Sequence, residues 1–397
     1  MQANRGVSSN GMQLKNNWHL AYCTNIHRGD DWAQTLASLQ THALAVRERI
    51  SPDRPYAIGL RLSDLASRQL SEPQALDSFR RWLQQHHCYV FTINGFPYGR
   101  FHGGKVKEQV YRPDWTHPDR LAYTNRLFDL LAHLLPEGVE GSVSTLPGSF
   151  KEFVVGAEYE AQIRQNLWKC IDHIERCSLR HGRRLSLALE PEPLGLWETS
   201  AEIVRLFREM EADRPGDPRL RAFLGVNYDA CHLAVEYEEP AGVIAALREE
   251  GIRIGKIHLS SALQIEPDKA AREWLRQFAD GIYLHQVIAR TPDGSLRRYK
   301  DLSPALEQPP GDLEWRIHFH VPLYAEFLAH GRTTALHLLG LLDILAREPA
   351  LCSHFEIETY TWEVLPEELR AQSVVEQLVR EYGWCLDQFA RRGVTRL

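Results

Sequence analysis

The stretch Leu185-Ser-Leu-Ala-Leu-Glu-Pro-Glu192 joins a run typical of a buried β-strand to two acidic residues at its end. Three later stretches, Phe223–His232, Ile254–His258 and His354–Glu358, also run from β-type residues into a carboxylate or an imidazole. In barrels of eight alternating strands and helices, catalytic groups lie at the C-terminal ends of the strands. The four stretches therefore predict one site built from four successive strands.

Strand-like runs alternate with segments of helical periodicity along the whole chain. The eight runs are His19–Ile26, Tyr56–Leu62, Tyr89–Ile93, Gly141–Thr145, Leu185–Leu189, Phe223–Tyr228, Ile254–Leu259 and Phe355–Thr359. This alternation predicts an α/β fold, a closed (β/α)8 TIM barrel. An open, doubly wound sheet is the main alternative, but no GxGxxG follows the first strand to support it.

A long segment, residues 282–323, interrupts the alternation between strands seven and eight. It contains a predicted β-hairpin, in which Tyr283–Arg290 and Leu296–Lys300 flank the turn Thr291-Pro-Asp-Gly294. We expect this insertion to cover the barrel mouth. A second long segment, Gly95–Trp115, follows strand three and is rich in glycine, aromatic and basic residues, which is typical of a functional loop.

The ends of the chain and its composition set further limits. Residues 1–16 are polar and are expected to form a disordered tail, leaving 17–397 as a single barrel domain. The net charge of -6 argues against nucleic acid as a partner, because phosphate binding requires a basic surface. No apolar run approaches the roughly 20 residues that span a bilayer.

The seven cysteines are scattered and include no CxxC, which indicates reduced thiols and a cytoplasmic protein. Cys231, which lies between Asp229 and His232, is the one cysteine worth considering as a nucleophile.

Glu190, Asp229, His258 and Glu358 are the predicted ligands of one divalent metal ion, Mn, Co, Zn or Fe. Each alone has a plainer interpretation: a salt-bridged core acid, a helix N-cap or a hydrogen-bonded packing histidine. Their shared position at strand ends favours the metal site. Glu356 alternates with Glu358 on the same face and is expected to pair within the barrel instead.

Three further histidines are candidates for a second metal ion or for supporting the first one. His232 follows Asp229 with the spacing D-x-x-H, and His318 and His320 form H-x-H, which presents two imidazoles on one side of a strand. A polar lid strand is the alternative interpretation of His318 and His320.

Candidates for substrate binding lie at other strand ends and in the two long segments. They are Arg61, Asn94, Tyr98, His102, Lys105 and His285. Lys105, together with Lys107, could hold a phosphate or carboxylate group, although both lysines also suit a solvated loop.

The order of Glu190, Asp229, His258 and Glu358 resembles that of the xylose isomerase-like TIM-barrel superfamily, which includes ketose 3-epimerases and endonuclease IV-type enzymes. The resemblance implies a metal-dependent isomerase or epimerase of a sugar or sugar phosphate, with Glu190 and Glu358 as catalytic base and acid. Endonuclease IV-type sites use further histidines from strands two and three, and those strand ends lack histidine here, so a trinuclear zinc site is not implied.

Longer strings resemble the EboE-like metabolite traffic proteins of a bacterial and cyanobacterial gene cluster. They are Thr92–Gly99, Ser144–Pro147, Leu189–Pro193, His318–Pro322 and Glu358–Trp362. This resemblance implies a role in preparing or moving precursors of secondary metabolites.

Three hypotheses on function remain. The leading one is the metal-dependent isomerase or epimerase, which stabilises an enediolate. The second is metal-assisted hydrolysis by a bound water, supported by His318 and His320. The third is a non-catalytic metabolite-binding protein on the same scaffold. In each case the expected partner is a small, polar, sugar-like molecule.

Overall fold

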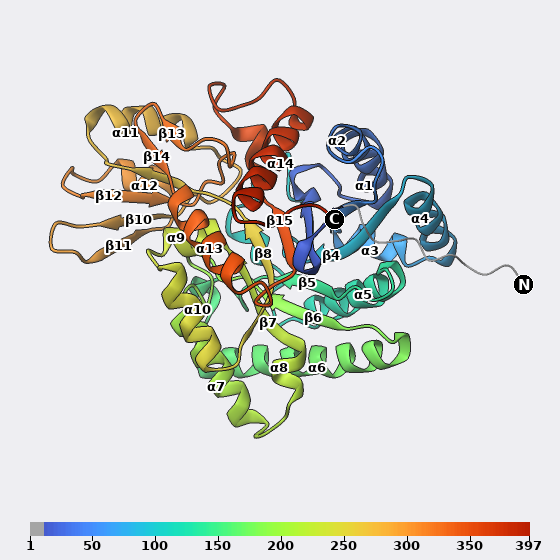
Figure 1. The fold of residues 1–397 in the computed structure, drawn as a ribbon. Coiled ribbons are helices and arrows are strands. Elements are labelled where there is room, and N and C mark those ends of the chain that lie inside the picture. Colours follow the sequence, from blue (N-terminus) through green and yellow to red (C-terminus); the bar gives the residue numbers. More distant parts are fainter. Residues whose placement is uncertain (1–11) are drawn as a thin grey trace, which may run out of the picture.

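The computed structural model describes residues 12–397, and its centre is a ring of parallel strands (Figure 1). The strands of this ring are β2 (Trp18–Tyr22), β3 (Tyr56–Arg61), β4 (Cys88–Asn94), β5 (Gly141–Thr145), β6 (Leu185–Leu189), β7 (Leu224–Asp229), β8 (Arg253–Leu259) and β15 (His354–Ile357). Neighbours pair in this order, β15 pairs with β2, and a parallel bridge between Cys23 and Gly59 joins β2 to β3. The parallel sheet therefore curls into the predicted (β/α)8 barrel.

Each predicted run overlaps one of these strands. The largest difference is at the first run, where β2 ends at Tyr22 and the short 3-10 helix η2 (Thr24–Ile26) follows. The backbone N–H of His27 donates to the carbonyl oxygen of Thr24 at 3.1 Å, and this turn takes the chain off the ring.

The helices between the strands surround the ring, as Figure 1 shows. They are α1 (Trp32–Ser38), α2 (Leu44–Ile50), α3 (Asp64–Leu70), α4 (Pro73–Gln85), α5 (Pro118–Leu134), α6 (Ala157–His181), α7 (Ser200–Asp213), α8 (Arg219–Phe223), α9 (Ala230–Val235), α10 (Pro240–Glu249), α13 (Ala335–Arg347) and α14 (Val374–Arg391). Their apolar stripes face the strands, as expected for helices at 3.6-residue periodicity; on α5, for example, Leu127, Phe128 and Leu131 are fully buried.

A second, antiparallel sheet lies beside the barrel (orange in Figure 1). It consists of β9 (Leu263–Ile265), β10 (Val287–Arg290), β11 (Leu296–Tyr299), β12 (Glu314–Ile317), β13 (Phe327–Leu328) and β14 (Gly331–Thr333), with α11 (Lys269–Leu275) and α12 (Leu302–Leu306) packed nearby. β10 and β11 pair as an antiparallel hairpin. The sheet extends beyond residues 282–323, because β12 and β14 both pair with β9.

The N-terminal tail expected over residues 1–16 falls mainly on residues 1–11, which lie outside the described residues. Residues 12–14 do not form a tail: Met12 and Leu14 are fully buried, and β1 (Gln13–Leu14) pairs antiparallel with β2. The buried side chains of Met12 and Leu14 hold this segment against the barrel, so the folded domain begins before residue 17.

The interior of the barrel contains an ion pair that lies below the strand ends. Lys256 on β8 contacts Glu356 on β15, and both side chains are fully buried, in line with the pairing expected for Glu356. Lys256 Nζ also lies 3.1 Å from Ser144 Oγ. Gly59 leaves the space for this pair, because a Cβ there would lie 1.9 Å from Glu356 Oε1 and 2.6 Å from the carbonyl oxygen of Tyr22.

The structure also bears on two features considered from the composition, a membrane span and the state of the cysteines. Within residues 12–397, no helix has both the length and the apolar character needed to cross a membrane. All seven cysteines are buried and unbridged. Burial and the nearby carboxylates raise the pKa of the Cys231 thiol well above its ordinary value, so this thiol stays protonated and is a poor nucleophile.

Candidate metal centre

The four predicted metal ligands come together at the C-terminal ends of β6, β7, β8 and β15. His258 Nδ1 lies 3.2 Å from each of three carboxylate oxygens, which belong to Glu190, Asp229 and Glu358. One N–H cannot donate to three oxygens at once, and Glu358 Oε2 has no hydrogen-bond partner within the described part of the chain. A cation would satisfy this arrangement. The four ligand atoms lie within 4.8 Å of one another, and the corners of a regular tetrahedron with edges of 3.2 Å lie about 2.0 Å from its centre, the distance of zinc and similar ions.

Each of the three carboxylates has its second oxygen held by a neighbouring side chain. The pairs are Asn227 Nδ2 with Glu190 Oε2 (2.9 Å), Ser260 Oγ with Asp229 Oδ1 (2.7 Å) and Asn25 Nδ2 with Glu358 Oε1 (2.8 Å). The oxygens left over are the three that surround His258 Nδ1. Donors of this kind orient metal ligands and raise the affinity of a metal site.

The imidazole of His258 is oriented in the same way, because its Nε2 lies 3.2 Å from Glu356 Oε2. Burial opposes a charge on this ring, but the carboxylates of Glu358 and Glu190 outweigh burial and raise the pKa of His258 well above its ordinary value. Burial also opposes the charge of Asp229, yet the neighbouring imidazoles hold the pKa of Asp229 well below its ordinary value. The donor set, three carboxylates and one imidazole, suits divalent cations such as Mn, Co, Zn or Fe.

His232, His318 and His320 form a second cluster beside the first. His232 and His320 direct Nδ1 at backbone carbonyl oxygens at 3.1 and 2.9 Å, and His318 directs Nδ1 at Gln286 Oε1 at 2.7 Å. Because these oxygens only accept, the ring protons lie on Nδ1 and the Nε2 lone pairs are free. Burial lowers the pKa of His232 to about 4 and the pKa of His318 well below its ordinary value, which keeps both rings neutral, as metal ligands require.

The Nε2 atoms of His232 and His320 lie 3.3 Å apart, so two lone pairs face each other. Three sets of residues in this cluster are close enough to hold an ion: Asp229 with His232 and His320, Glu192 with His232 and His318, and Cys231 with His318 and His320. His318 Nε2 and Glu192 Oε1 have no hydrogen-bond partner among residues 12–397.

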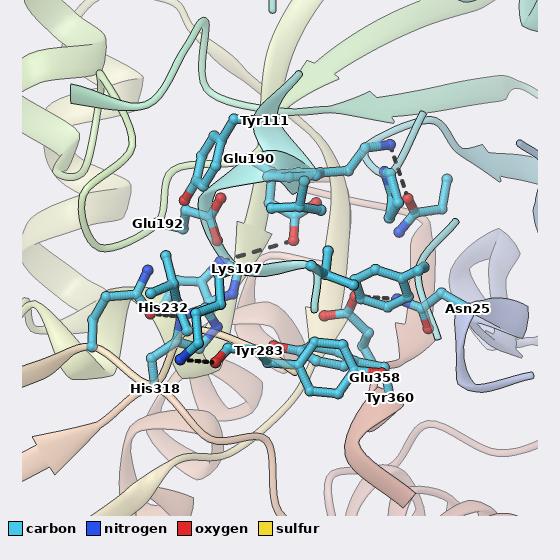
Figure 2. A pocket seen from close by; sticks show the side chains of 18 residues that line it. Asn25, Lys107, Tyr111, Glu190, Glu192, His232, Tyr283, His318, Glu358 and Tyr360 are labelled. Atoms are coloured by element: carbon cyan, nitrogen blue, oxygen red, sulfur yellow. Dashed lines mark hydrogen bonds and ion pairs between the residues drawn. The ribbon is translucent and has the colours of Figure 1, made fainter. Parts of the chain in front are cut away.

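A cavity opens above the first cluster, and Figure 2 shows it lined by acids, imidazoles and tyrosines. Its polar lining residues are Asn25, Asn94, Lys107, Glu190, Glu192, His232, Gln286, His318 and Glu358, and its other lining residues are Phe96, Pro97, Phe101, Val106, Val110, Tyr111, Tyr283, Leu284 and Tyr360. The segment between β9 and β14 thus contributes directly to the cavity, through Tyr283, Leu284, Gln286 and His318.

Asn94 is the one member of the predicted substrate-binding set that lines this cavity. Arg61 is buried, and its guanidinium donates to the carbonyl oxygens of Gly29, Pro97 and Gly99, so it holds loops together. Lys105 is exposed outside the cavity, whereas Lys107 lines it.

The other three predicted substrate-binding residues contact neighbouring protein groups and do not line the cavity. His102 places Nε2 against the carbonyl oxygen of Asn25 and Nδ1 2.6 Å from the hydroxyl of Tyr283, so it supports two residues that do line the cavity. Tyr98 packs edge-on against Tyr123. His285 is fully buried in the second-sheet region, between the carbonyl oxygen of His318 (3.0 Å) and Asp280 Oδ2 (2.5 Å).

Several residues of the site were not predicted from the sequence. Asn25 lies just beyond β2, where a strand-end rule could have found it, and Glu192 lies three residues beyond the end of β6. Tyr111, Tyr283 and Tyr360 lie in loops and short helices, where sequence periodicity carries no signal.

Comparison with solved structures shows a shared fold. A structure of L-ribulose 3-epimerase aligns with a TM-score of 0.50 and 11% identity, covering 94% of this chain and 95% of that chain. A D-tagatose 3-epimerase-like protein (TM-score 0.49, 11% identity, 94% and 98% covered) and an IOLI protein with a binding zinc atom (0.47, 12%, 94% and 98%) align over similar lengths. The first likeness supports the (β/α)8 barrel fold.

No protein-family model and no curated protein matches the chain. The narrower resemblance to the EboE-like metabolite traffic proteins is therefore not supported by these comparisons.

Proposed function

We propose that the protein is a metal-dependent isomerase or epimerase of a small, sugar-like hydroxy-carbonyl compound. The observation that carries this proposal is the set of three carboxylate oxygens at 3.2 Å around His258 Nδ1, two of which belong to cavity-lining acids, Glu190 and Glu358. When bound, a divalent cation would supply Lewis acidity toward the hydroxyl and carbonyl oxygens of the substrate.

The chain's own residues would move the proton. Glu190 takes the proton from the carbon that bears the hydroxyl, and the electron pair of that C–H bond shifts toward the carbonyl to form an enediolate. Glu358, protonated at the start of this step, then gives its proton to the opposite face of the same carbon, which epimerises it. If the proton goes instead to the neighbouring carbon, and the hydroxyl proton moves to the former carbonyl oxygen, the compound is isomerised. Asp229 and His258 complete the ligand set, and His232 is available to a substrate oxygen through its free Nε2.

The first test is the metal content of protein loaded with Mn²⁺ and then desalted. We expect about one ion per chain in the wild type and its loss in Glu190→Gln and Glu358→Gln, because each variant removes a carboxylate ligand. Glu381→Gln is the matched control: Glu381 is also a fully buried acid, but on α14 and hydrogen-bonded to Thr359 at 2.6 Å. Wild-type protein that takes up no ion would refute the proposal and favour a metabolite-binding protein.

The second test follows the proton. The metal-loaded protein is incubated in D₂O with a panel of ketoses, and deuterium at the carbon next to the carbonyl is measured by NMR. Replacement of either glutamate should slow the exchange by about a hundredfold or more. Exchange at the wild-type rate in both variants would contradict the assigned roles.

A second candidate function, metal-assisted hydrolysis, is favoured by the three free imidazole nitrogens of His232, His318 and His320. With a second cation there, a water held between two ions would be the nucleophile. About two ions per chain, falling to one in His318→Ala or His320→Ala while the first is retained, would support this function. One ion in all three proteins would argue against it.

A further inference from the structure

Apart from the proposed metal ion, the cavity offers a ligand no unpaired positive charge from residues 12–397. Among residues 12–397, Lys107 is the only lysine or arginine that lines it, and Lys107 Nζ already contacts Asp301 Oδ2 at 2.5 Å and the carbonyl oxygen of Tyr283 at 3.3 Å. A phosphate group would therefore enter a cavity lined by Glu190 and Glu192 without the arginine or lysine fork that usually binds it.

One wall of the cavity, beside Glu358, is formed by an aromatic cluster of Phe101, Tyr283 and Tyr360. Their ring centroids lie 5.2 to 5.4 Å apart, and the three rings come from separate segments: the loop after β4, the segment before β10, and η7 (Tyr360–Val364). Val106 packs into the same cluster. Figure 2 shows Tyr283 and Tyr360 side by side on this wall of the cavity.

Phe101 has no polar side-chain atom, so the aromatic cluster offers a ligand at most the hydroxyls of Tyr283 and Tyr360. The hydroxyl of Tyr283 lies 2.6 Å from His102 Nδ1 and is already engaged. The lining also includes Phe96, Val110 and Leu284, which have no polar side-chain atoms, and Tyr111, whose hydroxyl has no hydrogen-bond partner among residues 12–397. A fully hydroxylated sugar would leave hydroxyl groups unpaired against the apolar side chains, which is unfavourable, whereas an apolar group would bury its surface there.

We infer that the cavity takes an uncharged hydroxy-carbonyl compound with an apolar substituent, and not a sugar phosphate. The hydroxy-carbonyl end lies toward Glu190 and Glu358, and the substituent lies against the aromatic cluster. This inference rests on the proposed metal-dependent function, and it narrows the substrate class of the same site.

The test compares three probes that each carry a carbonyl group next to an oxygen-bearing carbon: dihydroxyacetone, dihydroxyacetone phosphate and 2-hydroxyacetophenone. Binding of each to the Mn²⁺-loaded full chain is measured by titration calorimetry. We expect 2-hydroxyacetophenone to bind about tenfold or more tightly than dihydroxyacetone, because its ring is buried. The phosphate ester should bind no more tightly than dihydroxyacetone.

Three variants test the aromatic cluster and Lys107 separately. Phe101→Ala should reduce the preference for 2-hydroxyacetophenone to about threefold or less while metal affinity is unchanged. Phe101→Leu, which still fills the space, should retain part of the preference and serves if the alanine variant does not fold. Lys107→Gln should leave the affinity for the phosphate ester unchanged.

Tighter binding of the phosphate ester than of dihydroxyacetone, lost in Lys107→Gln, would overturn the inference, as would a metal-loaded protein that binds none of the three probes. Failure of the proposed function itself is seen separately, as the lack of metal uptake or of deuterium exchange.

Discussion

Lys256→Met tests the ion pair on which the orientation of His258 depends. Lys256 and Glu356 have side chains that are 0% exposed, and they are in direct contact. Burial alone would raise the pKa of Glu356, but Lys256 and His258 outweigh it and lower the pKa below its ordinary value. Without the lysine, the carboxylate keeps only His258 Nε2 as a partner, since Glu356 Oε1 already has none among residues 12–397.

Removing one partner of a buried pair typically costs about 3–5 kcal/mol, because the remaining charge is buried without compensation. We therefore expect Lys256→Met to lower the free energy of unfolding by about this amount. Lys256→Met combined with Glu356→Leu should recover most of the loss, because an apolar pair needs no compensation.

The assay is urea unfolding followed by tryptophan fluorescence and circular dichroism, with a chelator present so that metal binding does not contribute. Arg391→Met is the control, because Arg391 and Asp387 pair at 2.8 Å with side chains 67% and 55% exposed, and such pairs contribute less than about 1 kcal/mol. A loss in Lys256→Met no larger than in Arg391→Met would refute the reasoning.

Three further changes have defined outcomes. Asn25→Ala should weaken metal affinity about 10- to 100-fold, measured by competition with a chelating dye, because Glu358 Oε1 loses its 2.8 Å donor; an unchanged affinity would contradict this role. Gly59→Ala should destabilise the fold by about 1–3 kcal/mol or more in urea unfolding, since its Cβ would lie 2.6 Å from a backbone oxygen; a neutral effect would mean that β3 shifts freely. Burial raises the pKa of Glu381 from 4.5 to about 7, so its stabilising contribution is complete below pH 4.5 and is lost as the pH rises to 7. The advantage of Glu381→Gln over wild type should therefore grow across this window to at most about 3 kcal/mol, and a constant difference from pH 4 to 8 would count against it.

The barrel strands and the four ligands could be predicted from the sequence because both follow local rules. A buried parallel strand is a short apolar run, and a polar residue at its end lies at the barrel mouth whatever the neighbouring strands are. Glu190, Asp229 and His258 each satisfy this rule within a few residues of sequence.

The substrate-binding residues could not be predicted in the same way, because loops lack periodicity. Lys105 and Lys107 look equivalent in sequence, yet only Lys107 faces the cavity, where it pairs with Asp301 from a distant segment. Arg61 ends a strand as the rule requires, but it donates to three loop carbonyls. The size of the second sheet depends on β9 and β14, which are short and are held by long-range pairing.

The sequence by itself determined the order of strands and helices and which acids and imidazoles stand at the strand ends, because these depend on residues close together in the chain. The tertiary structure alone decided that three carboxylate oxygens surround His258 Nδ1 and that Asn25, Asn227 and Ser260 each hold the other oxygen of one of those carboxylates. It also decided that aromatic rings from three segments close the cavity. These contacts join residues far apart in the chain, and they form only when closure of the barrel brings the strand ends within hydrogen-bonding distance.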